Sequence, residues 1–299
     1  MKKIKILTDS CSDLSGELLA KYDLDYGRMN IVYNGEEKIA SLTWDEYSPK
    51  KLYDIMRNGE RITTTQVPAQ EFVRIFKKYL DEEFDIIYIG CSSKQSGSVN
   101  TGTVVAKDLL KDYPDSRITC IDSLNASVGE GLLAVHAAEL LAAGKSYDEI
   151  VSGIIAVRKH VNQFVTVHSL DALKRAGRVK ASSAFLGNLM GVKPIIVSDV
   201  NGEQTPVKKV RGRAASLEEI VNLMKDAMEN PSEQTVYVAH ADCNPEELEM
   251  IKSFITQKID CKEIRMVYIG PIIGASIGPD AIGIWGFGKE VTYKVGEAK

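Results

Sequence analysis

Hydroxyl-bearing side chains gather in two short turns of the sequence, residues 62–68 and 91–98, and each turn precedes a predicted helix. Hydroxyls beside a helix N-terminus combine with free backbone N–H groups and the positive end of the helix dipole, an arrangement that binds carboxylates or phosphates. The residues that we single out there are Thr64, Thr65, Ser96 and Gly97. Two simpler alternatives stay open: the threonines only cap a helix, or the serine loop has no function.

Catalytic and metal motifs are missing from the printed sequence. The nucleophile-elbow spacing G-x-S-x-G does not surround Ser96, and residues 122–131 match neither G-x-G-x-x-G nor a phosphate-binding loop. The four histidines do not show H-x-x-x-H spacing, and the five cysteines form no C-x-x-C pair. We therefore predict a protein that is not an enzyme and that has no cofactor and no metal site.

Positive charge is concentrated in two segments, residues 170–178 and 208–213. Such runs usually form solvated surfaces, but they can also contact a partner or a phosphate group. The arginines that we predict as a partner surface are Arg175, Arg178, Arg211 and Arg213.

Composition narrows the class of protein. The net charge of −4 and the pI near 5.7 argue against nucleic acid as the main partner. No run approaches the roughly 18 apolar residues that an integral membrane segment needs, and the N-terminus lacks a signal-peptide pattern. The odd number of widely spaced cysteines fits a reducing compartment. We expect a folded cytoplasmic protein.

Short apolar strands alternate with amphipathic helices through the first half of the chain, as in residues 4–7, 68–80, 86–89, 98–110, 118–121 and 129–143. This alternation predicts an α/β fold, with an N-terminal Rossmann-like parallel sheet that has helices on both faces. A second α/β domain with a mixed sheet is expected to follow, so the predicted domains are residues 1–154 and 155–299. Helices at 146–160, from 170, at 182–190 and at 217–228 and strands at 164–167, 194–197, 235–240, 263–269 and 281–287 are expected in the later part, with a hairpin at 201–202.

The predicted topology brings the turns together. Ligands of open α/β sheets bind outside the carboxyl ends of the strands, and the strands ending near residues 7, 89 and 121 all lead into hydroxyl-rich turns. We expect these turns to face one crevice. The glycine- and proline-rich residues 269–283 predict tight turns that form its floor.

Taken in order, several segments resemble those of the DegV family over nearly the whole chain. The segments that carry the resemblance are Thr8-Asp9-Ser10 with Asp13-Leu14, Thr64-Thr65-Gln66, Ser96-Gly97-Ser98, Asp122-Ser123 with Gly129 and Gly131, Leu173–Arg178, Lys193-Pro194-Ile195, Val210-Arg211-Gly212 and Gly274–Gly283. Members of that family are similar in fold to the N-terminal region of dihydroxyacetone kinase and bind fatty acids. Some are the acyl-carrying subunit of a bacterial fatty acid kinase.

The resemblance implies a function and a site. It implies non-catalytic binding of a long-chain fatty acid such as palmitate in a buried tunnel, for lipid transport or fatty acid metabolism. The family's carboxylate-binding hydroxyls fall on Thr64 and Ser96, with Thr65 in place of the usual serine. Ser276 stands where the family has a histidine near the head group, and Val67, Ser98 and Thr101-Gly102 also depart from the family pattern. A fatty acid kinase subunit is the implied protein partner, although the histidine that faces it is replaced.

Two alternatives from other classes remain. One is an enzyme that acts on a small phosphorylated or carbonyl substrate and depends on Asp9 or Asp122. The other is a divergent member that binds another lipid or serves as an interaction module through the four arginines.

Overall fold

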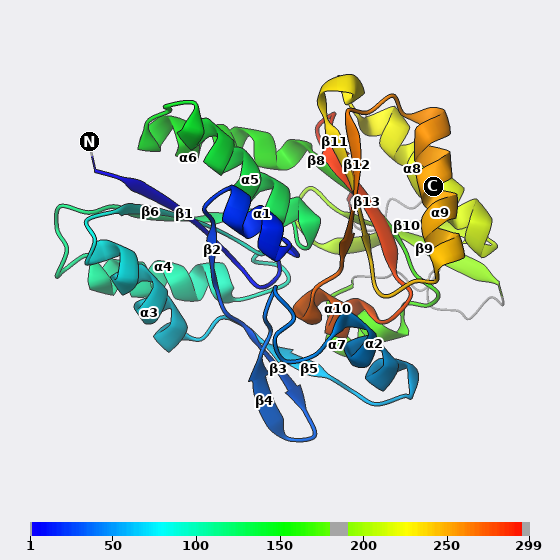
Figure 1. Ribbon diagram of the computed structural model, residues 1–299, viewed down its shortest axis with the longest axis horizontal. Coiled ribbons are helices and arrows are strands. Elements are labelled where there is room, and N and C mark those ends of the chain that lie inside the picture. The colour runs from blue at the N-terminus through cyan, green and yellow to red at the C-terminus, as the bar shows by residue number, and fades with distance from the viewer. Residues whose placement is uncertain (1, 180–190, 295–299) are drawn as a thin grey trace.

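The computed structural model of the chain describes residues 2–179 and 191–294. Its elements form an α/β fold with three sheets (Figure 1). The strands are β1 Ile4–Asp9, β2 Asp25–Gly27, β3 Asn30–Tyr33, β4 Glu36–Ile39, β5 Thr63–Thr65, β6 Asp85–Gly90, β7 Ile118–Asp122, β8 Val161–Thr166, β9 Val192–Ser198, β10 Gln204–Arg211, β11 Thr235–His240, β12 Glu263–Tyr268 and β13 Ile282–Phe287. The helices are α1 Gly16–Lys21, α2 Pro49–Arg57, α3 Ala69–Leu80, α4 Ser98–Leu109, α5 Val128–Ala142, α6 Tyr147–Val157, α7 Asp171–Ala176, α8 Arg213–Ala227, α9 Pro245–Lys258 and α10 Pro271–Ile277, with short 3-10 turns at Arg158–His160 and Pro231–Glu233.

The first sheet is parallel, in the order β2-β1-β6-β7, and it confirms the Rossmann-like prediction. Its central strand β6 is buried at every residue. Such a continuous apolar strand requires cover on both faces, and helices lie on both sides of this sheet in Figure 1. The crossover helices α3, α4 and α5 follow from amphipathic or apolar sequence at the predicted positions.

The second sheet is mixed and has the order β10-β9-β8-β13-β11-β12, also as predicted. One buried apolar cluster extends from the first sheet onto one face of this sheet, where it includes Val165 and Trp285. A separate cluster fills the other face under α8, around Leu217 and Ile251. The boundary predicted near residue 155 falls inside α6, and the division into two domains stays a prediction.

Some local predictions differ from the structure. Part of the glycine- and proline-rich segment forms the short helix α10, which begins at Pro271, because proline fits the first turn of a helix. Residues 63–65 form β5 in a small antiparallel sheet, β4-β3-β5, that projects below the rest of the molecule in Figure 1. They do not cap α3, whose N-cap is Pro68 without a side-chain hydrogen bond. The helix expected at 182–190 lies outside the described residues. Within the described ranges, no helix combines the length and the hydropathy needed to cross a bilayer.

Candidate functional site

A cavity of about 150 Å³ lies where the carboxyl ends of β1 and β6 meet β8, β13 and α10. It has room for roughly ten water molecules, far more than an ordinary packing defect of a protein interior. The described residues that line it are Cys11, Met29, Thr64, Thr65, Gln66, Cys91, Gln95, Ser96, Gly97, Ala126, Ser127, Gln163, Val165, Leu173, Arg178, Gln204, Ile269, Ile272, Ile273, Ser276, Ile277 and Trp285. All five residues predicted to bind the ligand are therefore brought together in one cavity wall.

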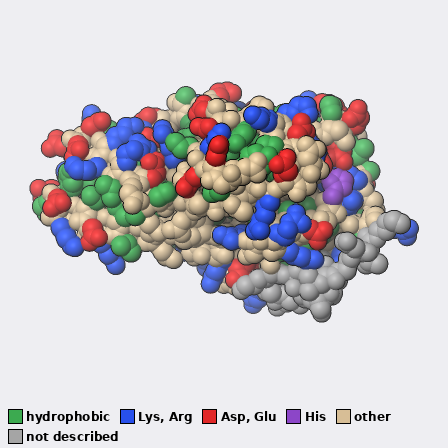
Figure 2. Space-filling view, turned by 90° about the horizontal axis from the view of Figure 1, so that it is seen from below, with side chains coloured by type: hydrophobic (Ala, Val, Ile, Leu, Met, Phe, Trp, Pro, Cys, Tyr) green, Lys and Arg blue, Asp and Glu red, His purple; other side chains and the backbone are tan. Residues whose placement is uncertain are grey.

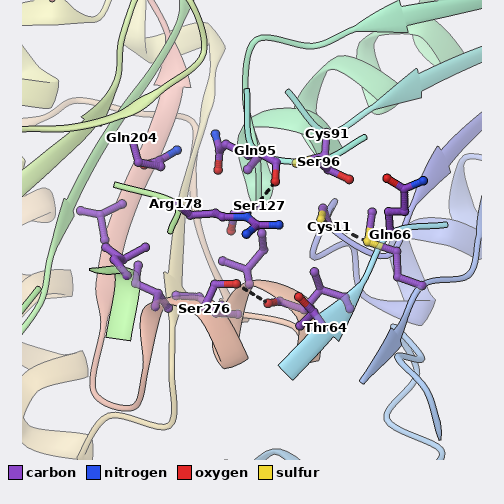
Figure 3. A pocket seen from close by; sticks show the side chains of 18 of the residues that line it. Cys11, Thr64, Gln66, Cys91, Gln95, Ser96, Ser127, Arg178, Gln204 and Ser276 are labelled. Carbon is purple, nitrogen blue, oxygen red and sulfur yellow. Dashed lines mark hydrogen bonds between the residues drawn. The ribbon is translucent and has the colours of Figure 1, made fainter. Parts of the chain in front are cut away.

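Thr64 is held by β5, where its backbone pairs with Ile31 of β3. No described residue donates a hydrogen bond to its hydroxyl or accepts one from it. Ser276 lies close to Thr64 (Figure 3), and its hydroxyl donates to the backbone oxygen of Ile272 at 3.3 Å. The neighbouring Thr65 makes only a long contact of 3.5 Å to Glu37. These hydroxyls retain capacity to bind a ligand.

Ser96 lies in the loop between β6 and α4. Its hydroxyl is 2.9 Å from that of Ser98, which accepts a hydrogen bond from the amide of Val67. If Ser98 donates to Ser96, the Ser96 proton is free to donate into the cavity. The Ser96 hydroxyl also accepts a hydrogen bond at 3.3 Å from the amide of Ser98, the first residue of α4. The N-cap residue Gly97 has no side chain to cap the helix, and the positive end of the helix dipole lies at this point.

Arg178 is one of the four arginines of the predicted partner surface, and it also lines the cavity. Its Nε donates to the Gln95 carbonyl at 3.0 Å, which fixes the guanidinium beside the Ser96 loop (Figure 3). A second hollow of about 530 Å³ adjoins the cavity, sharing Thr64, Arg178 and Ser276 with it. Arg61 and Arg175 line this hollow together with Glu60, so arginines outnumber carboxylates at this end of the cavity.

The other walls are mainly apolar. Ile269, Ile272 and Ile273 come from the segment of α10, and Trp285 and Val165 come from the mixed sheet. The side-chain amides that this sheet contributes to the described lining are Gln163 and Gln204, and Gln163 donates to Gln204 at 2.7 Å. Sequence reasoning missed these two residues and Trp285. The available signal was the buried polar pair Asn162-Gln163 at the start of a strand that continues with Phe164 and Val165.

Ionisable groups in the wall are few. Of the described lining residues, none is Asp, Glu, Lys or His, so only Arg178 and the thiols of Cys11 and Cys91 can carry charge. The three turns do reach the cavity, as predicted, but they do so through Cys11, Cys91 and Ser127. Ser10, Ser92 and Ser123 are fully buried, and each makes hydrogen bonds within the protein.

Asp9 and Asp122, on which the enzyme alternative depends, do not line the cavity, and neither does Asp280. Asp9 is buried outside the cavity wall and accepts hydrogen bonds from Tyr88 and from the amides of Cys11 and Cys91. Asp122 accepts from the amides of Ser93 and Leu124. Asp280 pairs with Arg57 at 2.7 Å and does not line the cavity. Two other carboxylates lie nearer the hydroxyl end: Glu37 is 3.5 Å from the Thr65 hydroxyl, and Glu60 lines the adjoining hollow.

The predicted partner-surface arginines occupy different environments. Arg175, Arg178 and Arg211 are exposed. Arg213 is directed inward instead, where it forms an ion pair with Glu247 at 2.9 Å and donates to the carbonyl of Asp280 at 2.7 Å. Its guanidinium connects α8 with the loop before β13.

Comparison with known proteins identifies relatives along the whole chain. A family model described as "Uncharacterised protein, DegV family" matches residues 3–288. A DegV domain-containing protein of Clostridium perfringens is 34% identical over 288 residues, which cover 96% of this chain and 98% of the relative.

Solved structures of other proteins superpose on nearly the whole chain. A DegV family protein from Thermus thermophilus, described as binding fatty acid, superposes with a TM-score of 0.86 at 24% identity and covers 97% of this chain and 100% of its own. DegV of Bacillus subtilis, described as a fatty acid binding protein, is 26% identical with a TM-score of 0.82 and the same coverage. A stearic acid-binding protein from Eubacterium ventriosum is 25% identical with a TM-score of 0.82, covering 96% of this chain and 98% of its own. The match over residues 3–288 and the close relatives show that the chain belongs to the DegV family.

Proposed function

We propose that this protein binds one long-chain fatty acid, such as palmitate, without reacting with it. The observation that carries the proposal is the polarity of the cavity: hydroxyl and guanidinium donors at one end, and apolar walls elsewhere. The carboxylate is bound by the hydroxyls of Thr64, Thr65 and Ser96, by the amide of Gly97, and by Ser276. The acyl chain extends between the two predicted domains, residues 1–154 and 155–299, both of which supply lining residues.

The acyl chain and the carboxylate contribute to the free energy of binding in different ways. Burial of an acyl chain gains about 0.8 kcal/mol per methylene, so the apolar wall supplies most of the affinity. Hydrogen bonds to a charged carboxylate contribute about 1.5–3 kcal/mol each and fix which end enters the polar region. Arg178 adds Coulombic attraction at the rim without being a buried unpaired charge, because it is exposed.

The relatives support this choice of ligand. The Bacillus subtilis and Eubacterium ventriosum proteins are described as fatty-acid-binding and share the fold over nearly the full chain. The competing proposal of an enzyme has less support, because general acid–base catalysis needs a titratable group at the ligand, and neither Asp9 nor Asp122 lines the cavity.

The proposal also includes a surface that contacts a partner protein. Figure 2 shows Lys and Arg side chains gathered near the middle of the face that carries β5, α7 and α10. Arg175 and Arg178 line the hollow beside the hydroxyl end, and Arg211 is also exposed. We place on this face the contact with a fatty acid kinase subunit, to which the head group would be presented. All five cysteines are free thiols, which fits a carrier in the reducing cytoplasm.

The test is lipid content and affinity. We expect organic extracts of the purified protein to contain about one long-chain fatty acid per chain. After delipidation, Ser96→Ala and Thr64→Val should each weaken palmitate binding roughly ten-fold, the loss of one charge-assisted hydrogen bond.

Ser93→Ala is the matched control, because Ser93 is exposed in the same loop and does not line the cavity. An extract without lipid would refute fatty-acid binding. Unchanged affinity in both cavity variants would refute the head-group assignment alone.

A further inference from the structure

Beside the cavity, three buried groups with metal-ligand chemistry converge from distant parts of the chain. One ligand atom from each of Cys11, Cys91 and Glu130 lies within 4.8 Å of the others. Cys11 follows β1, Cys91 follows β6, and Glu130 is in the first turn of α5. Figure 3 labels both cysteines on the side of the cavity that also carries Ser96 and Gln66. Two thiols and one carboxylate are a ligand set that suits Zn²⁺.

The Glu130 carboxyl group is only half satisfied. Its Oε1 accepts hydrogen bonds from the Thr8 hydroxyl at 2.7 Å and from the Asp9 amide at 3.3 Å. Its Oε2 accepts no hydrogen bond from a described donor, although the side chain is fully buried and the Asp9 carboxyl lies within hydrogen-bond reach of the Glu130 carboxyl. A buried carboxylate oxygen without a partner is costly, and a cation is one group that would satisfy it.

Asp9 already positions the two cysteines. Its Oδ1 accepts from the Cys11 amide at 2.8 Å, and its Oδ2 accepts from the Cys91 amide at 3.2 Å and from the Tyr88 hydroxyl at 2.6 Å. One carboxylate thus holds both turns that carry the sulfurs. Outer groups that fix the ligands in this way are a regular part of metal sites.

The cluster has no positive charge of its own. Neither Asp9 nor Glu130 has a basic ion-pair partner in the described part of the chain. A divalent cation would supply the positive charge that these buried acidic groups lack.

We propose that Cys11, Cys91 and Glu130 bind a thiophilic divalent cation of the Zn²⁺ class, with Asp9 as a positioning residue. The two thiols and the carboxyl group lose their protons to solvent as the ion binds. Three protein ligands leave a fourth position, and because Cys11 and Cys91 line the cavity, that position faces it and the cavity is the entry path. The proposal is independent of the fatty-acid ligand.

The experiment uses the full-length chain, treated with a chelator under reducing conditions and then given one equivalent of Zn²⁺ or Co²⁺. We expect about one zinc per chain to remain after dialysis. The Co²⁺ form should show thiolate-to-metal charge-transfer absorption in the near ultraviolet. Affinity should rise with pH, because protons compete with the metal for the same three groups.

Variants separate this site from adventitious binding. Cys91→Ser and Glu130→Gln should each lower zinc affinity on the order of 100-fold. Glu130→Gln keeps the oxygen that accepts from Thr8, and an unchanged far-ultraviolet circular dichroism spectrum reports that the variant is folded. Cys261→Ser is the control, since its half-buried thiol is not part of the cluster.

Two results would overturn the proposal. One is a wild-type protein that retains no zinc and gives no charge-transfer band, in which case Glu130 is simply a protonated partner of Asp9. The other is equal zinc affinity in the wild type and in both cluster variants. Lipid extracted from the same samples reports separately on fatty-acid binding.

Discussion

Replacement of Asp9 by alanine should lower the free energy of unfolding by about 3–5 kcal/mol. The carboxyl group accepts hydrogen bonds from Tyr88 and from the amides of Cys11 and Cys91, all of which are buried. Alanine would leave these three donors without an acceptor. Chemical denaturation of the delipidated protein measures the loss.

Two further variants bracket this effect. Asp9→Asn keeps one acceptor oxygen and should cost less than Asp9→Ala. Asp112→Ala removes an exposed carboxylate and should change the free energy of unfolding by no more than about 0.5 kcal/mol. A loss below about 1 kcal/mol for Asp9→Ala would show that water or a rearranged loop satisfies the donors.

Replacement of Asp13 by asparagine should remove a large part of the pH dependence of stability. Burial raises the pKa of Asp13 to about 7, against the hydrogen bonds from the Ser127 hydroxyl and the Gly270 amide. Between the ordinary value of 3.8 and about 7, the folded state holds a proton that the unfolded state has lost. The stabilisation from this protonated group is therefore complete below the unfolded pKa and is lost as pH rises toward 7.

Between pH 5 and pH 7 the wild type should lose about 2 kcal/mol more stability than Asp13→Asn. Asparagine also suits the backbone at this position, where φ is 51°. Denaturation curves at several pH values measure the difference, with Asp112→Asn as the control. Parallel pH profiles for wild type and Asp13→Asn would mean that Asp13 is ionised in the folded protein throughout this range.

The fold was predictable where local periodicity and burial agree. The apolar run in β6 and the amphipathic pattern of α3 gave strands and helices close to the observed bounds. β5 was not predictable, because three threonines carry no periodicity and the strand depends on pairing with β3, a contact distant in sequence. The helix α10 was not predicted, because glycines within and beside it usually indicate turns.

The site was predictable in part for a related reason. The family resemblance singles out the hydroxyls of Thr64, Ser96 and Ser276, and all three line the cavity, although Thr64 lies in β5 and Ser276 in α10. The sequence could not predict that Arg213 points inward, because its ion-pair partner Glu247 lies on another helix. The cluster of Cys11, Cys91 and Glu130 has no recognisable spacing either, because the parallel sheet alone brings these residues together.

The small sheet of β3, β4 and β5 places one head-group hydroxyl on a peripheral element. β5 has three residues and pairs with β3 alone, outside the two large sheets (Figure 1). Elements with so few contacts open locally at a much smaller free-energy cost than global unfolding. If a carboxylate binds beside Thr64 as proposed, it would enter and leave while both cores remain intact, and amide hydrogen exchange in β5 should be fast in the empty protein and slowed in the loaded one.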